Sequence, residues 1–136
     1  MYKIFVLTLL LGLSFACTKP IEKNDIVSPV DTDKELASGT FSGANRYTTT
    51  GIAKLIKDKD GKRFLLLENF HTDRGPDLRI FLSTSLRNDN FIELTNKLSV
   101  GNVRLEVPAE TNTEEQKFVL VWCKAFSVLF GSAELK

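Results

Sequence analysis

The chain has 136 residues, with 18 lysines and arginines, 17 aspartates and glutamates, and a formal net charge of +1 at pH 7. Nucleic-acid binding depends on clustered basic residues that neutralise phosphates, whereas the arginines here stand singly among carboxylates, so the composition argues against this class of function. The length fits one domain of ordinary size with its own apolar core.

The N-terminus has the pattern of an export signal that ends at a cysteine. Lys3 precedes an apolar stretch over residues 4–13, and a small residue stands directly before Cys17. The stretch is short for a membrane-spanning helix, which needs about 20 apolar residues. The pattern resembles the lipobox of bacterial lipoproteins, with Phe15 bulkier than the usual residue. We therefore expect residues 1–16 to be removed and Cys17 to be lipidated, while an ordinary secretory signal, the alternative, would also export the chain.

Residues 17–37 are expected to form a flexible tether after the lipidated cysteine. Pro20, Pro29, mixed charges and few aromatic residues give a composition that buries too little apolar surface to become ordered. A tether of this length would hold the folded domain, expected over residues 38–136, roughly 25 Å from its anchor. The predicted location is therefore the bacterial cell envelope, close to a membrane and outside the cytoplasm.

The remaining sequence predicts an all-β domain. Short runs rich in β-branched and aromatic residues alternate with Gly, Asn, Asp and Pro, as in β-sandwiches and β-barrels. Val103, Leu105 and Val107 alternate with polar residues, which favours antiparallel pairing. We predict an antiparallel β-sandwich of about eight strands, with a closed β-barrel as the alternative. The expected strands are 40–44, 47–56, 63–70, 78–83, 91–95, 100–107, 118–124 and 126–135.

The strand expected at 118–124 is apolar on both faces. Residues 118, 120 and 122 would point one way and residues 119, 121 and 123 the other, so the strand should lie centrally and be covered on both sides. Phe126 continues the same apolar periodicity in the next strand. Trp122 and Phe126 are therefore predicted to belong to the core rather than to a ligand-stacking platform.

Two segments resemble a known family. Gly75-Pro76-Asp77-Leu78 leads into one predicted strand, and Trp122-Cys123 lies within another; in this order they are similar to the DM-thirteen domain. The resemblance covers residues 38–136. It implies an extracytoplasmic all-β module with a role in electron transfer, in which Cys123 is the proposed redox residue.

The residues around Cys123 leave its role open. With Cys17 assigned to the lipid anchor, no intramolecular disulfide can form in the domain. A reactive thiol needs a stabilised thiolate, whereas valines at 119 and 121 favour a buried, unreactive cysteine. A redox cycle through one cysteine would pass through a sulfenic acid, a mixed disulfide with a partner protein, or a cofactor carried elsewhere.

Residues 71–77 form the second candidate site. His71, the only histidine, is close in sequence to Asp73 and Asp77, and these side chains could contact a ligand or a partner. The Gly75-Pro76-Asp77 sequence is also typical of a tight connection in which the Asp side chain accepts hydrogen bonds from backbone N–H groups. We favour the turn interpretation and predict no metal site.

No cofactor or motif of a self-sufficient enzyme is evident. The sequence lacks a phosphate-binding glycine loop, a Cys-x-x-Cys pair and a hydrolase motif. The preferred hypothesis is a membrane-anchored extracytoplasmic redox module that works with an unidentified partner protein. The alternative is a lipid-anchored module that binds a protein or glycan through residues 71–77, with Cys123 buried in the core. A small-ligand carrier is a third hypothesis and would require a barrel with a cavity.

Overall fold

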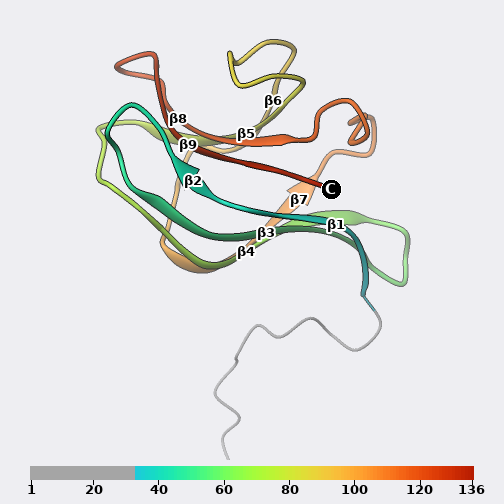
Figure 1. Ribbon diagram of the computed structural model, residues 1–136. Coiled ribbons are helices and arrows are strands. Elements are labelled where there is room, and N and C mark those ends of the chain that lie inside the picture. The colour runs from blue at the N-terminus through green and yellow to red at the C-terminus, as the bar shows by residue number, and fades with distance from the viewer. Residues whose placement is uncertain (1–32) are drawn as a thin grey trace, which may run out of the picture.

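The structure, a computed structural model, describes residues 33–136 and shows two β-sheets packed face to face (Figure 1). The expectations for the export signal and Cys17 lie outside the described residues. No helix in the described part is long and apolar enough to cross a membrane. The strands are β1 (Lys34–Thr40), β2 (Ser42–Gly43), β3 (Thr49–Lys57), β4 (Arg63–Thr72), β5 (Leu78–Ser83), β6 (Ile92–Thr95), β7 (Gly101–Val107), β8 (Phe118–Cys123) and β9 (Val128–Glu134).

Every strand pairing in the two sheets is antiparallel. One sheet has the order β1-β3-β4-β7 and the other has the order β2-β9-β8-β5-β6. Both sheets have free edges, so the predicted all-β sandwich is confirmed and the closed barrel is wrong. The inward-facing side chains of both sheets form one hydrophobic core.

The N-terminal part of the domain differs from the expected strand 40–44. β1 begins at Lys34, so residues 34–37 belong to a sheet and not to the tether, and the domain starts before position 38. Phe41 is buried where the chain crosses to the second sheet and enters β2. The polar residues of β1 concealed this strand because an edge strand pairs through its backbone and needs few buried side chains.

The prediction for the apolar strand at 118–124 is confirmed by β8. It lies between β9 and β5, with further strands outside both. Val119 and Val121 face the core between the sheets, whereas Leu120 lies on the outer face, and all three are fully buried. Leu120 pairs with Phe81, whose ring stacks on Phe91 with 4.4 Å between ring centroids, so aromatic side chains cover the outer face there.

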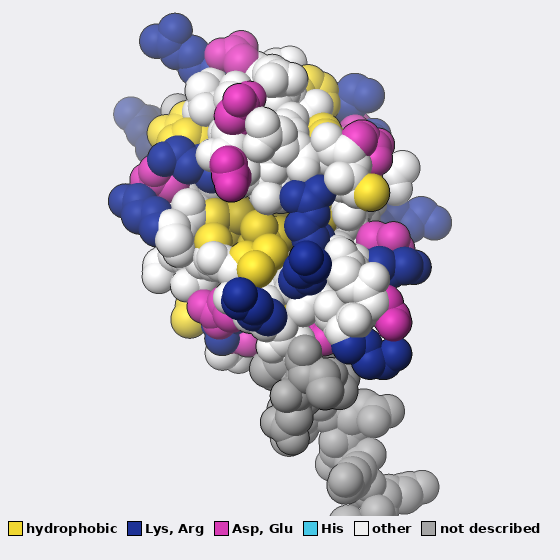
Figure 2. Space-filling view, turned by 90° about the vertical axis from the view of Figure 1, so that its right-hand side faces the viewer, with side chains coloured by type: hydrophobic (Ala, Val, Ile, Leu, Met, Phe, Trp, Pro, Cys, Tyr) yellow, Lys and Arg dark blue, Asp and Glu magenta, His cyan; other side chains and the backbone are white. Residues whose placement is uncertain are grey.

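The sandwich has two ends with different loops. We call the end formed by residues 44–48, 73–77, 96–100 and 124–127 the distal end, at the left of Figure 1. The opposite, proximal end contains the start of β1, because Lys34 pairs with Lys57 beside the β3–β4 connection. Figure 2 shows the proximal end, with a hydrophobic hollow bordered by basic side chains. The hollow is lined by Leu36, Ala37, Leu55, Thr113, Glu114, Lys117, Leu135 and Lys136.

Candidate functional site

The two segments that resemble the DM-thirteen family meet at the distal end. Leu78, the first residue of β5, is the Cα partner of Cys123, the last residue of β8. One step further out, the backbone N–H of Lys124 donates a hydrogen bond to the carbonyl oxygen of Asp77, with an N···O distance of 2.9 Å. Strand pairing therefore places the Gly-Pro-Asp-Leu segment directly beside the Trp-Cys segment.

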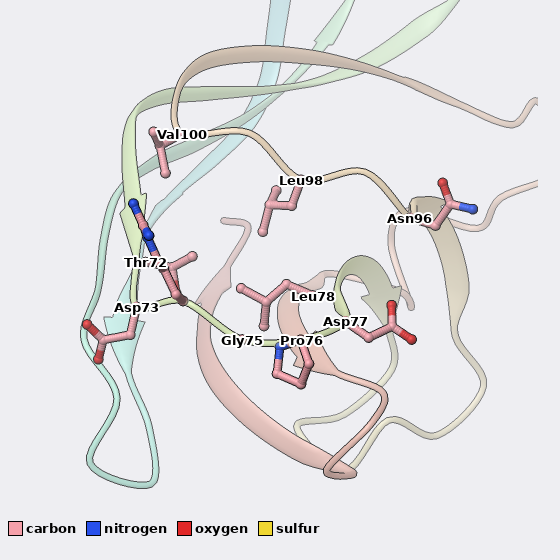
Figure 3. Close-up of a pocket in the computed structure, with 10 residues that line it drawn as sticks. Thr72, Asp73, Gly75, Pro76, Asp77, Leu78, Asn96, Leu98 and Val100 are labelled. Carbon is pink, nitrogen blue, oxygen red and sulfur yellow. The ribbon is translucent and has the colours of Figure 1, made fainter.

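A pocket of about 350 Å³ opens between loops 73–77 and 96–100. Figure 3 shows the apolar side chains of Leu78, Leu98 and Val100 directed into the space between these loops. Thr72, Asp73, Arg74, Gly75, Pro76, Asp77 and Asn96 complete the lining. An apolar interior with polar groups around it is typical of a binding site for a small ligand or a side chain of a partner.

Cys123 is the strand neighbour of a residue of the pocket lining but does not itself line the pocket. Its side chain is fully buried, forms no disulfide, and belongs to the hydrophobic core. Its Cα partners on the two sides are Leu78 and Val128. Leu78 lines the pocket and Cys123 does not, so a partner in the pocket would reach the thiol only after Leu78 or the end of β8 had moved.

The structure brings Asp73 and Asp77 to the pocket but not His71. Asp73 Oδ2 accepts a hydrogen bond from the Thr48 N–H at 2.7 Å, and the Asp73 N–H donates to the Thr48 carbonyl at 3.0 Å. Asp73 therefore holds loop 44–48 against loop 73–77. His71 instead lies in β4, exposed and paired with Thr50. Within residues 33–136, no group of three or more His, Cys, Asp and Glu side chains is arranged to hold a metal ion.

Within residues 33–136 the Asp77 carboxylate binds a side chain, and the backbone cap that the sequence predicted is not formed. Its carboxylate accepts hydrogen bonds from Arg79 Nε at 2.6 Å and Nη2 at 3.2 Å, while Arg79 Nη1 donates to Glu93 at 2.6 Å. The bond from Arg79 lowers the pKa of Asp77, and the charge of Lys124 adds to this, although burial opposes the change. The carboxylate is therefore ionised and oriented, with its charge largely neutralised.

The prediction that Phe126 belongs to the core is wrong, and Trp122 is only half-buried. β8 ends at Cys123, and the chain turns through residues 124–127 with a φ of 52° at Ser127. This turn ends the strand alternation and leaves Phe126 57% exposed. Trp122 lies on the outer face opposite Arg79, beside a second hollow of about 540 Å³. The turn was missed because residues 124–127 contain none of the usual turn markers Gly, Pro, Asn or Asp.

Sequence reasoning also missed Leu98 and Val100, which form part of the pocket. Loop 96–100 carries the chain from β6 in one sheet to β7 in the other. Its position beside loop 73–77 follows from the pairing of β6 with β5 and of β7 with β4. No local pattern in the sequence indicates this meeting of two loops.

The chain was compared with known protein families, curated proteins and solved structures. A family model described as "Electron transfer DM13" matches residues 40–135. No curated protein and no solved structure gives a significant match. The family match spans most of the chain and includes both segments that meet at the pocket, Gly75–Leu78 and Trp122-Cys123. This chain therefore belongs to the DM13 electron-transfer family.

Proposed function

We propose that this protein is a membrane-anchored electron-transfer module of the bacterial cell envelope, with Cys123 as its redox residue and the distal pocket as the docking site for a partner. The observation that carries the proposal is the pairing of Leu78 with Cys123 inside the region that matches the family. Leu78 lines the pocket and is the strand partner of Cys123, so the cysteine is adjacent in the sheet to a residue of the pocket lining. The domain would act with a partner rather than as a self-sufficient enzyme.

The proposed reaction of Cys123 is thiol–disulfide exchange with a partner protein. The thiol loses its proton to solvent, and the thiolate attacks one sulfur of a partner disulfide. That disulfide breaks, a mixed disulfide forms at Cys123, and the second partner sulfur leaves as a thiolate. Because Cys123 is the only cysteine of the described domain, a thiol from a partner must resolve the mixed disulfide.

Exchange requires the end of β8 to open. Cys123 is the last residue of its strand and precedes an exposed turn, so its separation from Leu78 disrupts the end of the β5–β8 ladder and the adjacent hydrogen bond from the Lys124 N–H to the Asp77 carbonyl. Local openings of this kind cost less free energy than global unfolding.

A second candidate function is favoured by the complete burial of Cys123. In this alternative the same pocket binds a protein segment or a glycan, and the cysteine only fills the core. A buried free cysteine among apolar neighbours is common and unreactive. The two functions differ in one measurable property, the accessibility of the thiol in the native state.

The test uses the full chain carrying Cys17→Ser, so that Cys123 is the only thiol, and an aromatic disulfide reagent. If only global unfolding exposed the thiol, a stability of about 5 kcal/mol would slow the native reaction by roughly 10³-fold or more. The redox proposal predicts that the native thiol reacts only slightly more slowly than the unfolded one, and that low urea concentrations do not change the native rate. It also predicts that the thiol of the Leu78→Ala variant reacts faster with the reagent than the wild-type thiol. Phe126→Ala, at an exposed position, serves as the control. Protection of the thiol until global unfolding would remove the redox role and leave the binding function.

The membrane anchor has a separate test in a bacterial host. The wild-type chain is expected to enter the detergent phase with added mass at Cys17, and Cys17→Ser is expected to stay in the aqueous phase. A wild-type chain without acylation would contradict the anchor and leave only export.

A further inference from the structure

The distal end presents exposed basic side chains without ion-pair partners. Each of its four loops supplies one exposed cation, and none of the four takes part in an ion pair within residues 33–136. They are Arg46, Arg74, Lys97 and Lys124. The only carboxylates of these loops are already engaged, Asp73 by the Thr48 N–H and Asp77 by Arg79. The four cations outnumber the two carboxylates of these loops, so the loops together carry a net positive charge.

Apolar side chains are exposed among these cations. Val100, at the mouth of the pocket, is 60% exposed, and Phe126, at the tip of turn 124–127, is 57% exposed. In residues 33–136 these two are the most exposed of the large hydrophobic side chains. Exposed apolar groups inside a polar rim are a mark of a protein interaction surface.

Loop 73–77 joins the four loops into one surface. It shares the pocket with loop 96–100, contacts loop 44–48 through Asp73, and contacts turn 124–127 through the hydrogen bond from Lys124 to Asp77. Loop 44–48 is also fixed to β9, because Asn45 Nδ2 donates to the Leu129 carbonyl at 3.0 Å. The cations and the apolar groups are thus held by loops that are bonded to one another.

We propose that the distal end docks an acidic face of a partner protein, with an apolar side chain of the partner in the pocket and carboxylates opposite the four cations. This inference rests on the proposed function, because it identifies the partner that would reach Leu78 and Cys123. Electron-transfer partners form small, weak interfaces in which complementary charge steers the encounter and the apolar centre supplies the contact. β1 begins at the opposite, proximal end, so an N-terminal membrane anchor would attach at that end and leave the distal end directed away from the membrane. This arrangement favours a protein, and not the membrane, as the partner of the distal end.

The test measures binding of a synthetic probe peptide to the full chain carrying Cys17→Ser. The peptide contains leucine and phenylalanine flanked by glutamates, and amide chemical shifts report the site and the dissociation constant. We expect shifts in the four distal loops and weaker binding as salt rises, because salt screens exposed charges over about 8 Å at physiological ionic strength. The variant Arg74→Gln/Lys97→Gln/Lys124→Gln should weaken binding at least about fivefold.

The matched control removes three exposed lysines of the proximal end. Lys34→Gln/Lys57→Gln/Lys62→Gln changes the net charge by the same amount, and its affinity should stay within about twofold of the wild type. The substituted positions are exposed and should tolerate these changes. A further variant, Val100→Ser/Phe126→Ser, removes the two exposed apolar side chains and should also weaken binding.

Three results would overturn the docking inference. They are an equal loss of affinity in the distal and proximal variants, undiminished binding of a peptide with glutamine in place of glutamate, and binding to anionic phosphatidylglycerol vesicles without binding to the peptide. Failure of the proposed redox function is separate from these results. A thiol that stays protected until unfolding, in a chain that binds the peptide, removes the redox role and leaves the docking face.

Discussion

Substitution of Cys123 by alanine and by serine tests the burial of the thiol through stability. Cys123 is fully buried in the core between Leu78 and Val128. In Cys123→Ala the lost transfer free energy is about 0.8 kcal/mol, and a cavity of roughly 25 Å³ adds about 0.6 kcal/mol. Cys123→Ser nearly preserves the volume but places a hydroxyl among apolar side chains. A buried hydroxyl without a partner costs about 1–3 kcal/mol, so the serine variant should be at least as unstable as the alanine variant.

The assay is urea unfolding followed by tryptophan fluorescence and circular dichroism. With an m value of about 1–3 kcal/mol/M, a loss of 1 kcal/mol lowers the urea midpoint by about 0.3–1 M, so both variants should be resolved from the wild type. Phe126→Ser, at an exposed position of the adjacent turn, serves as the control and should change the stability little. A serine variant within about 0.3 kcal/mol of the wild type, with an unchanged m value, would refute the burial argument.

Two further predictions concern the aspartates of the pocket. Arg79 lowers the pKa of Asp77 below its ordinary value of 3.8, so the pair stabilises the fold at neutral pH, and this contribution is lost as the pH falls through the lowered pKa. Asp77→Asn should therefore be less stable than the wild type at pH 7. Urea unfolding across a pH series should show that the difference in stability between the two proteins shrinks below pH 3.8. A difference in stability that does not depend on pH would contradict the ion pair. Asp73→Ala removes the acceptor of the Thr48 N–H and should cost about 1 kcal/mol, with faster hydrogen exchange at Thr48. Unchanged protection of that amide would show that Asp73 does not hold loop 44–48.

The sequence alone determined the fold class, the central strand and the segments that carry the family resemblance. Alternation with a period of two is a local property, so the antiparallel strand Gly101–Val107 and the doubly buried β8 could be recognised from side-chain pattern alone. Turn residues before Leu78 likewise marked the start of β5 correctly. These features depend on neighbours in the chain and need no knowledge of strand order.

Only the tertiary structure decided what forms the site. β1 was missed because its pairing with β3 is made by the backbone, and Phe126 was misplaced because a turn without Gly, Pro, Asn or Asp ended the strand alternation. The pocket depends on loop 96–100 meeting loop 73–77, which follows from the order of strands in two sheets. Many strand orders are compatible with the same local alternation, and only pairing between distant segments selects one of them. For this reason the position of Leu78 beside Cys123 and in the pocket lining could not be derived from the sequence.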